Sequence, residues 1–82
     1  IPSEIGNLTN LTTLGFSSNQ LSGGIPSEIG NLTNLIPLFG LVLLYNQLTG
    51  DIPQEVCDLI ESNNLEILFI IDGNNLINTC SE

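Results

Sequence analysis

The 82-residue sequence contains no basic residue: it has nine acidic side chains and no lysine, arginine or histidine. Binding to a nucleic-acid backbone depends on cationic side chains that displace counterions from the phosphates. Attraction to an anionic membrane surface depends on the same kind of side chain. The charge balance therefore excludes nucleic acid and anionic membrane surfaces as partners.

The lack of histidine also bears on catalysis and metal binding. Histidine is the usual general base and the commonest transition-metal ligand, and no serine or cysteine here has a basic partner that would activate it as a nucleophile. The sequence has no initiator methionine, no signal-peptide pattern and no apolar run long enough to span a bilayer. We expect no enzyme activity, no cofactor and no membrane insertion.

The chain does contain a repeat. Eleven residues, Ile1–Leu11, recur unchanged as Ile25–Leu35, 24 positions later. A period of this length is typical of a solenoid, in which one unit is stacked on copies of itself. The period divides the chain into coils at residues 1–24, 25–51 and 52–76, with a C-terminal cap at 77–82, all in one domain. Because residue 1 begins a coil, we expect a fragment or processed part of a longer repeat array.

The strand-like segments carry a recognisable pattern. Residues 14–23 read LGFSSNQLSG, and residues 41–50 read LVLLYNQLTG. The full pattern, L-x-x-L-x-L-x-x-N-x-L-x-G-x-I-P, resembles the plant-type leucine-rich repeat of receptor-like kinase ectodomains and polygalacturonase-inhibiting proteins. The resemblance implies an α/β solenoid with parallel strands on its concave face and short helical turns or 3-10 segments on its convex face. The second coil departs from the pattern by three extra residues near 36–40, and the third by one before Phe69.

Three asparagines occupy equivalent places after the strands: Asn19, Asn46 and Asn74. An inward amide can satisfy backbone groups that a turn leaves unpaired, and stacked copies would form a ladder. A ligand contact is the alternative interpretation of these side chains. We expect the structural ladder.

Three carboxylates, Glu4, Glu28 and Glu55, follow the repeated prolines at the start of a helical turn. Stacking would place them in a row about 5 Å apart, since neighbouring coils are spaced like strands. Such a row could hold Ca²⁺. We expect a solvated convex ridge instead, and no metal site.

The two ends of the stack differ in sequence. Cys57 and Cys80 are the only cysteines, and a disulfide between them would tie the tail to the last coil. Two free buried thiols are the alternative. At the other end, the apolar residues of coil 1 have no cap, so we expect further repeats to cover this edge or the chain to associate with itself through it.

The sequon for N-glycosylation occurs at Asn7, Asn10 and Asn31, and crowding makes Asn10 the weaker acceptor. Together with the expected disulfide and the family resemblance, these sequons favour an extracellular or cell-surface location.

The outward residues of the concave strands are the candidate ligand-binding set: Val42, Leu44, Tyr45, Ile70 and Asp72. An exposed apolar patch often marks an interaction site, and an aromatic residue suits the centre of an interface. The alternative is a shift of one residue in the second coil, which would exchange the inward and outward side chains.

These observations predict a non-catalytic extracellular recognition module that binds a protein, peptide or glycan on its concave face. The alternative function is that of a structural, self-assembling glycoprotein that forms fibres or surface layers. A weaker alternative is ice binding, for which the threonines are too few and too irregularly placed.

Overall fold

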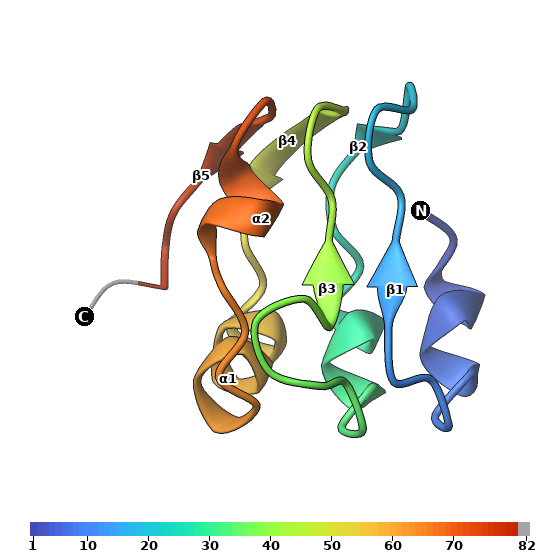
Figure 1. Cartoon of the computed structure of the whole chain (residues 1–82). Coiled ribbons are helices and arrows are strands. Elements are labelled where there is room, and N and C mark those ends of the chain that lie inside the picture. Colours follow the sequence, from blue (N-terminus) through green and yellow to red (C-terminus); the bar gives the residue numbers. More distant parts are fainter. Residues whose placement is uncertain (81–82) are drawn as a thin grey trace.

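The computed structural model of the chain describes residues 1–80, which form the predicted solenoid of three stacked coils (Figure 1). Coil 1 contains the 3-10 helix η1 (Ser3–Asn7) and the strands β1 (Leu14–Gly15) and β2 (Ser22–Gly23). Coil 2 contains η2 (Ser27–Asn31), β3 (Leu41–Val42) and β4 (Gln47–Asp51). Coil 3 contains the helices α1 (Gln54–Ser62) and α2 (Leu68–Ile71) and the strand β5 (Asn75–Ile77).

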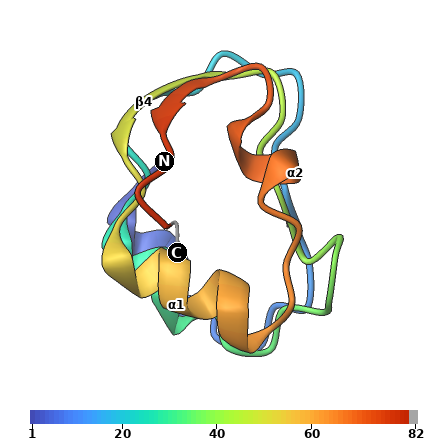
Figure 2. The same ribbon diagram turned by 90° about the vertical axis from the view of Figure 1, so that its left-hand side faces the viewer.

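The strands form two parallel sheets on different sides of the coils. β1 pairs with β3, with Leu14 opposite Leu41, and β2, β4 and β5 make a second sheet in that order. A view along the stack shows each coil as a ring, with α1 on one side and β4 and α2 on others (Figure 2). Two sheets and a row of short helices therefore enclose the core.

Burial of the core depends on having a coil on either side. Leu32 in coil 2 is completely buried, whereas Leu8, its equivalent in coil 1, is 51% exposed. The two residues lie in identical sequence, so the difference arises from the neighbouring coils and not from the residues. Ile1, Ile5 and Leu11 are also only partly buried at this edge. The apolar side chains of coil 1 are thus less buried than those of coil 2, because no described coil lies on that side of coil 1.

Glycine lets the short helices of neighbouring coils approach closely. A Cβ at Gly6 would lie 2.6 Å from the carbonyl oxygen of Glu28, and one at Gly30 would lie 2.8 Å from the Cβ of Glu55. Contacts this close do not occur with a side chain present, so both positions need glycine for steric reasons. The same close approach holds coil 1 to coil 2 and coil 2 to coil 3.

The asparagines after the strands connect the coils. The Oδ1 of Asn46 accepts a hydrogen bond from the Leu21 backbone N–H (3.2 Å), and its Nδ2 donates to the carbonyl oxygens of Phe16 (2.7 Å), Leu43 and Leu44. Asn74 repeats the arrangement between coils 3 and 2, because its Oδ1 accepts from the Leu48 N–H at 3.1 Å.

Asn19 differs from the inward residue that its sequence position predicts. Its side chain is exposed and donates only to carbonyl oxygens of its own coil, those of Phe16 and Ser17. The reason is physical: an inward amide needs the backbone of a preceding coil as a partner, and no described coil precedes coil 1.

The concave segment of coil 3 is helical, although its sequence predicts a strand. α2 replaces the strand expected at Phe69 and the residues after it. Ile70 is consequently completely buried, and its predicted place on the exposed ligand-binding face is wrong. Within residues 1–80, no helix is long and apolar enough to cross a membrane.

Candidate recognition surface

The face formed by β1, β3 and α2 changes character from coil 1 to coil 3. In β3 and the two residues after it, Leu41 and Leu43 are completely buried, while Val42 and Leu44 are half-buried on the other side of the chain. This is the expected register of the second coil, and it excludes the alternative shifted by one residue. At the corresponding outward positions, coil 1 has Gly15 and the exposed Ser17. The apolar outward side chains therefore lie on the second and third coils only.

Tyr45 lies beyond the end of β3 and is 63% exposed. Its backbone has a positive φ of 59°, and its N–H donates to the Asp72 carbonyl at 3.2 Å. Gly73 lies directly beneath it, because a Cβ at Gly73 would overlap the tyrosine ring and lie 2.7 Å from its Cα. The exposed Asp72 is thus next to the Tyr45 backbone, and these two members of the predicted set come together.

A second group of exposed apolar residues was not predicted from the sequence. Phe39 is 60% exposed, and its ring stacks on Phe69 with centroids 5.2 Å apart and an interplanar angle of 19°. Leu38 and Leu68 are each about half exposed. We call these four residues, Leu38, Phe39, Leu68 and Phe69, the aromatic patch. The signal that could have found it is the three-residue insertion near 36–40, which has no equivalent in coil 1.

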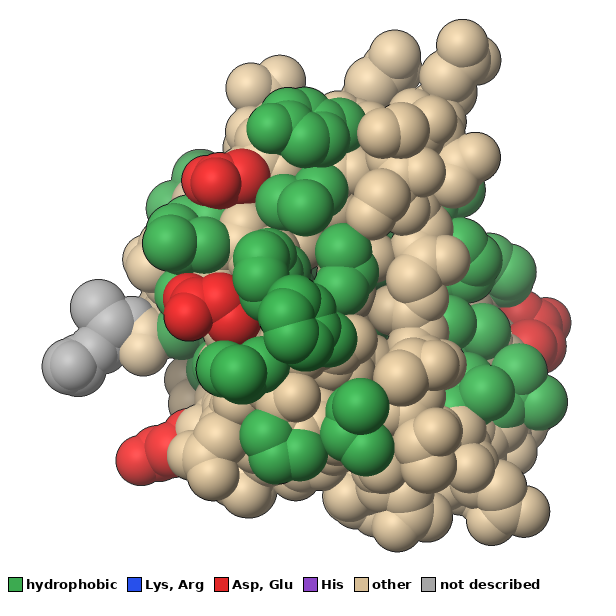
Figure 3. All heavy atoms as spheres, in the orientation of Figure 1, with side chains coloured by type: hydrophobic (Ala, Val, Ile, Leu, Met, Phe, Trp, Pro, Cys, Tyr) green, Lys and Arg blue, Asp and Glu red, His purple; other side chains and the backbone are tan. Residues whose placement is uncertain are grey.

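The inserted segment projects beyond the outline of the other coils (green in Figure 2). Backbone hydrogen bonds join it to coil 3: the Leu38 N–H donates to the Asn64 carbonyl (2.9 Å), and the Glu66 N–H donates to the Leu38 carbonyl (3.3 Å). Space-filling atoms show the apolar side chains gathered over β3 and α2, with acidic side chains among them (Figure 3). Over β1 the same face is formed mainly by other side chains and backbone.

The charged side chains on this face are all negative. Asp72 and Glu66 follow and precede α2, and the Glu66 carboxylate accepts a hydrogen bond from the Leu68 N–H at 3.3 Å. The whole chain has no lysine, arginine or histidine to neutralise them. A ligand on this face therefore meets an apolar surface in a negative field.

The convex side holds the remaining predicted residues. Glu4, Glu28 and Glu55 are exposed, as are the sequon asparagines Asn7, Asn10 and Asn31. Among residues 1–80, no group of three or more carboxylate, thiolate or imidazole side chains lies close enough together to hold a metal ion. The three glutamates therefore do not form a common binding site in this part of the chain.

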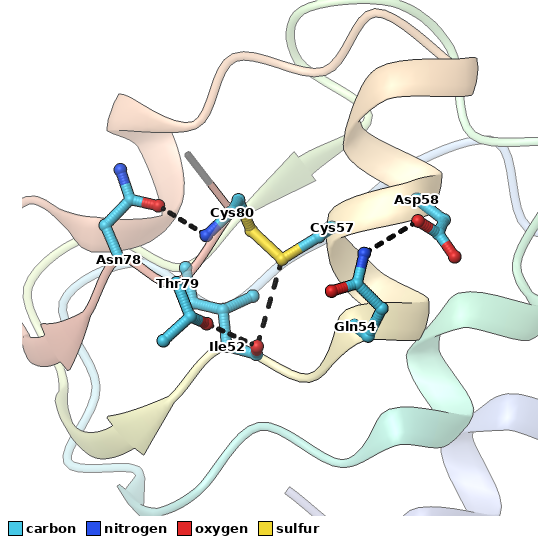
Figure 4. The surroundings of a disulfide bond; sticks show 7 residues. All are labelled: Ile52, Gln54, Cys57, Asp58, Asn78, Thr79 and Cys80. Carbon is cyan, nitrogen blue, oxygen red and sulfur yellow. Dashed lines mark hydrogen bonds between the residues drawn. A yellow bond between two sulfur atoms is a disulfide. The ribbon is translucent and has the colours of Figure 1, made fainter. Parts of the chain in front are cut away.

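The C-terminal end is closed by a disulfide between Cys57 in α1 and Cys80 (Figure 4). The Thr79 hydroxyl donates to the Ile52 carbonyl at 2.8 Å, which adds a second link between the tail and the third coil. Beside the disulfide lies an open hollow of about 430 Å³, lined by apolar side chains and by acidic ones such as Glu61. Of the predicted cap at 77–82, residues 81 and 82 lie outside the described part of the chain.

Comparison with known proteins identifies the architecture. The family model of the Leucine Rich Repeat matches residues 10–32. A chain of the BIR3–SERK2 complex from Arabidopsis thaliana superimposes with a TM-score of 0.75 and 34% sequence identity, over 95% of this chain and 38% of that one. A chain of the crystal structure of PEPR1-AtPEP1 gives a TM-score of 0.68 and 32% identity, over 93% of this chain and 9% of that one. The sequence has no significant match among curated proteins.

These likenesses agree with the stacked parallel strands and 3-10 turns, and the chain folds as a leucine-rich-repeat solenoid. It spans 38% and 9% of the length of the two solved chains.

Proposed function

We propose that this leucine-rich-repeat solenoid is a non-catalytic module that recognises a polypeptide through the face of β3 and α2. The observation that carries the proposal is the concentration of outward apolar side chains on this face, with Tyr45 63% exposed and Phe39 60% exposed. Contiguous exposed apolar surface is characteristic of interaction sites. Exposed aromatic residues that lie at the centre of a contact commonly supply much of the binding energy.

The likeness to solved structures supports the same function. The two solved relatives come from the BIR3–SERK2 complex and from PEPR1-AtPEP1, so each stands beside a named partner. The non-catalytic part of the proposal rests on the lack of histidine and lysine, two of the side chains that commonly act as general acids or bases.

We also place the module outside the cell. A disulfide closes its C-terminal end, and disulfides persist in oxidising compartments. The sequon asparagines Asn7 and Asn31 are exposed on the convex side, away from the proposed binding face. Expression through a eukaryotic secretory pathway should give a product whose mass falls on treatment with an N-glycosidase. No change in mass would show that the sequons are not glycosylated, and they would then no longer support an extracellular location.

The binding function is tested with a random dodecapeptide library displayed on phage. Peptides selected on the wild-type chain should bind Tyr45→Glu at least tenfold more weakly, since a charge at a central aromatic disrupts the contact. The matched control is Ser3→Glu, which adds the same charge on η1, at an exposed position of the convex side. Circular dichroism should show both variants folded. Equal binding to both of these variants, and to a Phe39→Ser variant as well, would refute recognition by this face.

A second candidate function is self-assembly through the edge of coil 1. It rests on Leu8, which is 51% exposed where its coil-2 equivalent is buried, beside an open hollow of about 250 Å³ lined by residues 8–11. Light scattering after size exclusion, at several protein and Ca²⁺ concentrations, should show a mass that rises with concentration and falls in Leu8→Glu. A constant mass of one chain would exclude this function.

A further inference from the structure

We propose that the aromatic patch selects a polypeptide segment in which an apolar or aromatic side chain is flanked by lysine or arginine. This inference rests on the proposed function and defines the chemistry of its partner. It depends on three features: a preorganised apolar anchor site, a negative field around it, and the absence of any basic side chain from the sequence.

The anchor site is preorganised by its backbone. Leu38 has a positive φ of 66°, a conformation that is unfavourable for a residue with a Cβ atom. Gly40 permits the tight turn that follows, because a Cβ there would overlap the carbonyl oxygen of Ile36. Hydrogen bonds from Leu38 to Asn64 and from Glu66 to Leu38 hold the turn against coil 3. The turn thus holds Phe39 in solvent, stacked on Phe69, at a cost in backbone strain.

This arrangement does not serve the core. The buried residues of coils 2 and 3 form a continuous core without Phe39, and in coil 1 the same stretch is three residues shorter. Residues with a strained backbone cluster at functional sites, and here the strained turn holds two exposed apolar side chains, Leu38 and Phe39, and not core residues. A stacked aromatic pair offers a flat apolar surface of low conformational entropy, which suits the side chain of a partner.

The negative charges around the aromatic patch favour some partners over others. Glu66 and Asp72 bracket α2, and the chain carries a net charge of −9 with no basic residue. An acidic partner would be repelled, and a second copy of this chain could supply no basic side chain to the patch. Electrostatic complementarity sets specificity and the rate of association more than it sets affinity. A segment with apolar anchors beside lysine or arginine satisfies both the patch and the field.

The same phage-displayed dodecapeptide library tests the inference. Selected peptides should be enriched in leucine or aromatic residues and in lysine or arginine, and depleted in aspartate and glutamate. Their binding should fall about tenfold or more in Phe39→Ser, as expected for truncation of a central aromatic anchor. Ile77→Ser is the matched control, since Ile77 is an exposed apolar residue of similar accessibility on β5.

A second pair of variants tests the charge. Glu66→Gln keeps an oxygen to accept the Leu68 N–H and removes one negative charge at α2. Its affinity for selected peptides should fall about twofold to fivefold at low salt, the range of exposed ion pairs, and the difference should shrink at high salt. Glu4→Gln removes the same charge from the convex side and should leave binding unchanged.

The outcomes separate the two levels of the proposal. Peptides that depend on Tyr45 but carry no excess of basic residues, or bind Phe39→Ser normally, would overturn this inference and leave the proposed function standing. A library that yields no peptide sensitive to Tyr45 or Phe39, or a face that binds neutral glycans instead, would overturn both. Enrichment of basic and apolar residues together with loss in Phe39→Ser supports both.

Discussion

Replacing Asn46 by alanine should remove the main polar link between the first two coils. The side chain is 93% buried and makes four hydrogen bonds, one as acceptor and three as donor. Two of its partners, Leu21 and Phe16, lie in coil 1 and the other two in coil 2. We expect a stability loss much larger than that of an average surface substitution.

The magnitude follows from what each partner retains. The carbonyl of Phe16 also accepts from the Asn19 side chain, that of Leu43 from Asn74, and that of Leu44 from the Ser18 N–H. Each of these bonds should therefore cost only the net value of a hydrogen bond at the lower end, about 0.5 kcal/mol. Among residues 1–80, the Leu21 N–H has no other acceptor, and leaving it unpaired costs about 1–3 kcal/mol. Together these four bonds give a loss of about 2.5–4.5 kcal/mol, a large share of the stability of a small domain.

The assay is urea unfolding followed by far-ultraviolet circular dichroism, with the slope of the transition compared between variants. The matched control is Asn19→Ala, which removes the equivalent residue of coil 1, where the exposed amide donates only within its own coil. That control should cost less than about 1 kcal/mol, since two exposed hydrogen bonds contribute little. Equal losses in the two variants would refute the assignment of Asn46 as a link between coils.

Three further predictions concern packing, covalent closure and charge. Gly30→Ala should lower the free energy of unfolding by about 1–3 kcal/mol because its Cβ would meet Glu55, while Gly15→Ala, with no atom within 4 Å, should be neutral or slightly stabilising in the same urea assay. In the double variant Cys57→Ser with Cys80→Ser, the free energy of unfolding should fall by about 3 kcal/mol, as expected for a loop closed across 23 residues. A reducing agent should have no further effect on this variant. A loss near zero would contradict the explanation by loop-closure entropy. Raising NaCl from about 10 mM to about 500 mM should raise the urea concentration at the unfolding midpoint, because every charged side chain is acidic and salt screens their repulsion. A midpoint that falls with salt would refute this explanation.

The parts of the fold that could be predicted are those that obey the repeat. The period placed the coils, the buried Leu41 and Leu43, and the positions of Asn46 and Asn74, because each depends only on contacts with an equivalent residue in the neighbouring coil. The disulfide was predicted from the position of the cysteines about one coil apart.

The helix α2 could not be predicted, because its cause lies in the fit between coils. Leu38 pairs with Leu65, and the stacked asparagines Asn46 and Asn74 fix the other end of the segment. Between these two points the chain advances by nine residues in the third coil, from 65 to 74, and by eight in the second, from 38 to 46. A helical turn rises only about 1.5 Å per residue, against about 3.3 Å in a strand, and so takes up the additional length. The apolar run at residues 67–71 reads locally as a strand, and the tertiary constraint overrides it.

The aromatic patch could not be predicted for a different reason. The inserted residues near 36–40 have no equivalent in coil 1, so the repeat assigns them neither an inward nor an outward direction. Only the pairing of Leu38 with coil 3 orients Phe39 toward Phe69.

The glycine contacts between the short helices have a consequence for how such a chain can change in length. Gly6 packs on Glu28 in the same way that Gly30 packs on Glu55, so the short helices of all three coils meet through equivalent contacts. A tandem duplication of the first 24 residues would repeat the Gly6–Glu28 contact, because Glu4 of the next copy would stand where Glu28 stands now. Gain of a whole coil therefore preserves the contacts between the short helices, whereas gain of a few residues must be absorbed locally, as a projecting turn in the second coil and a turn of helix in the third.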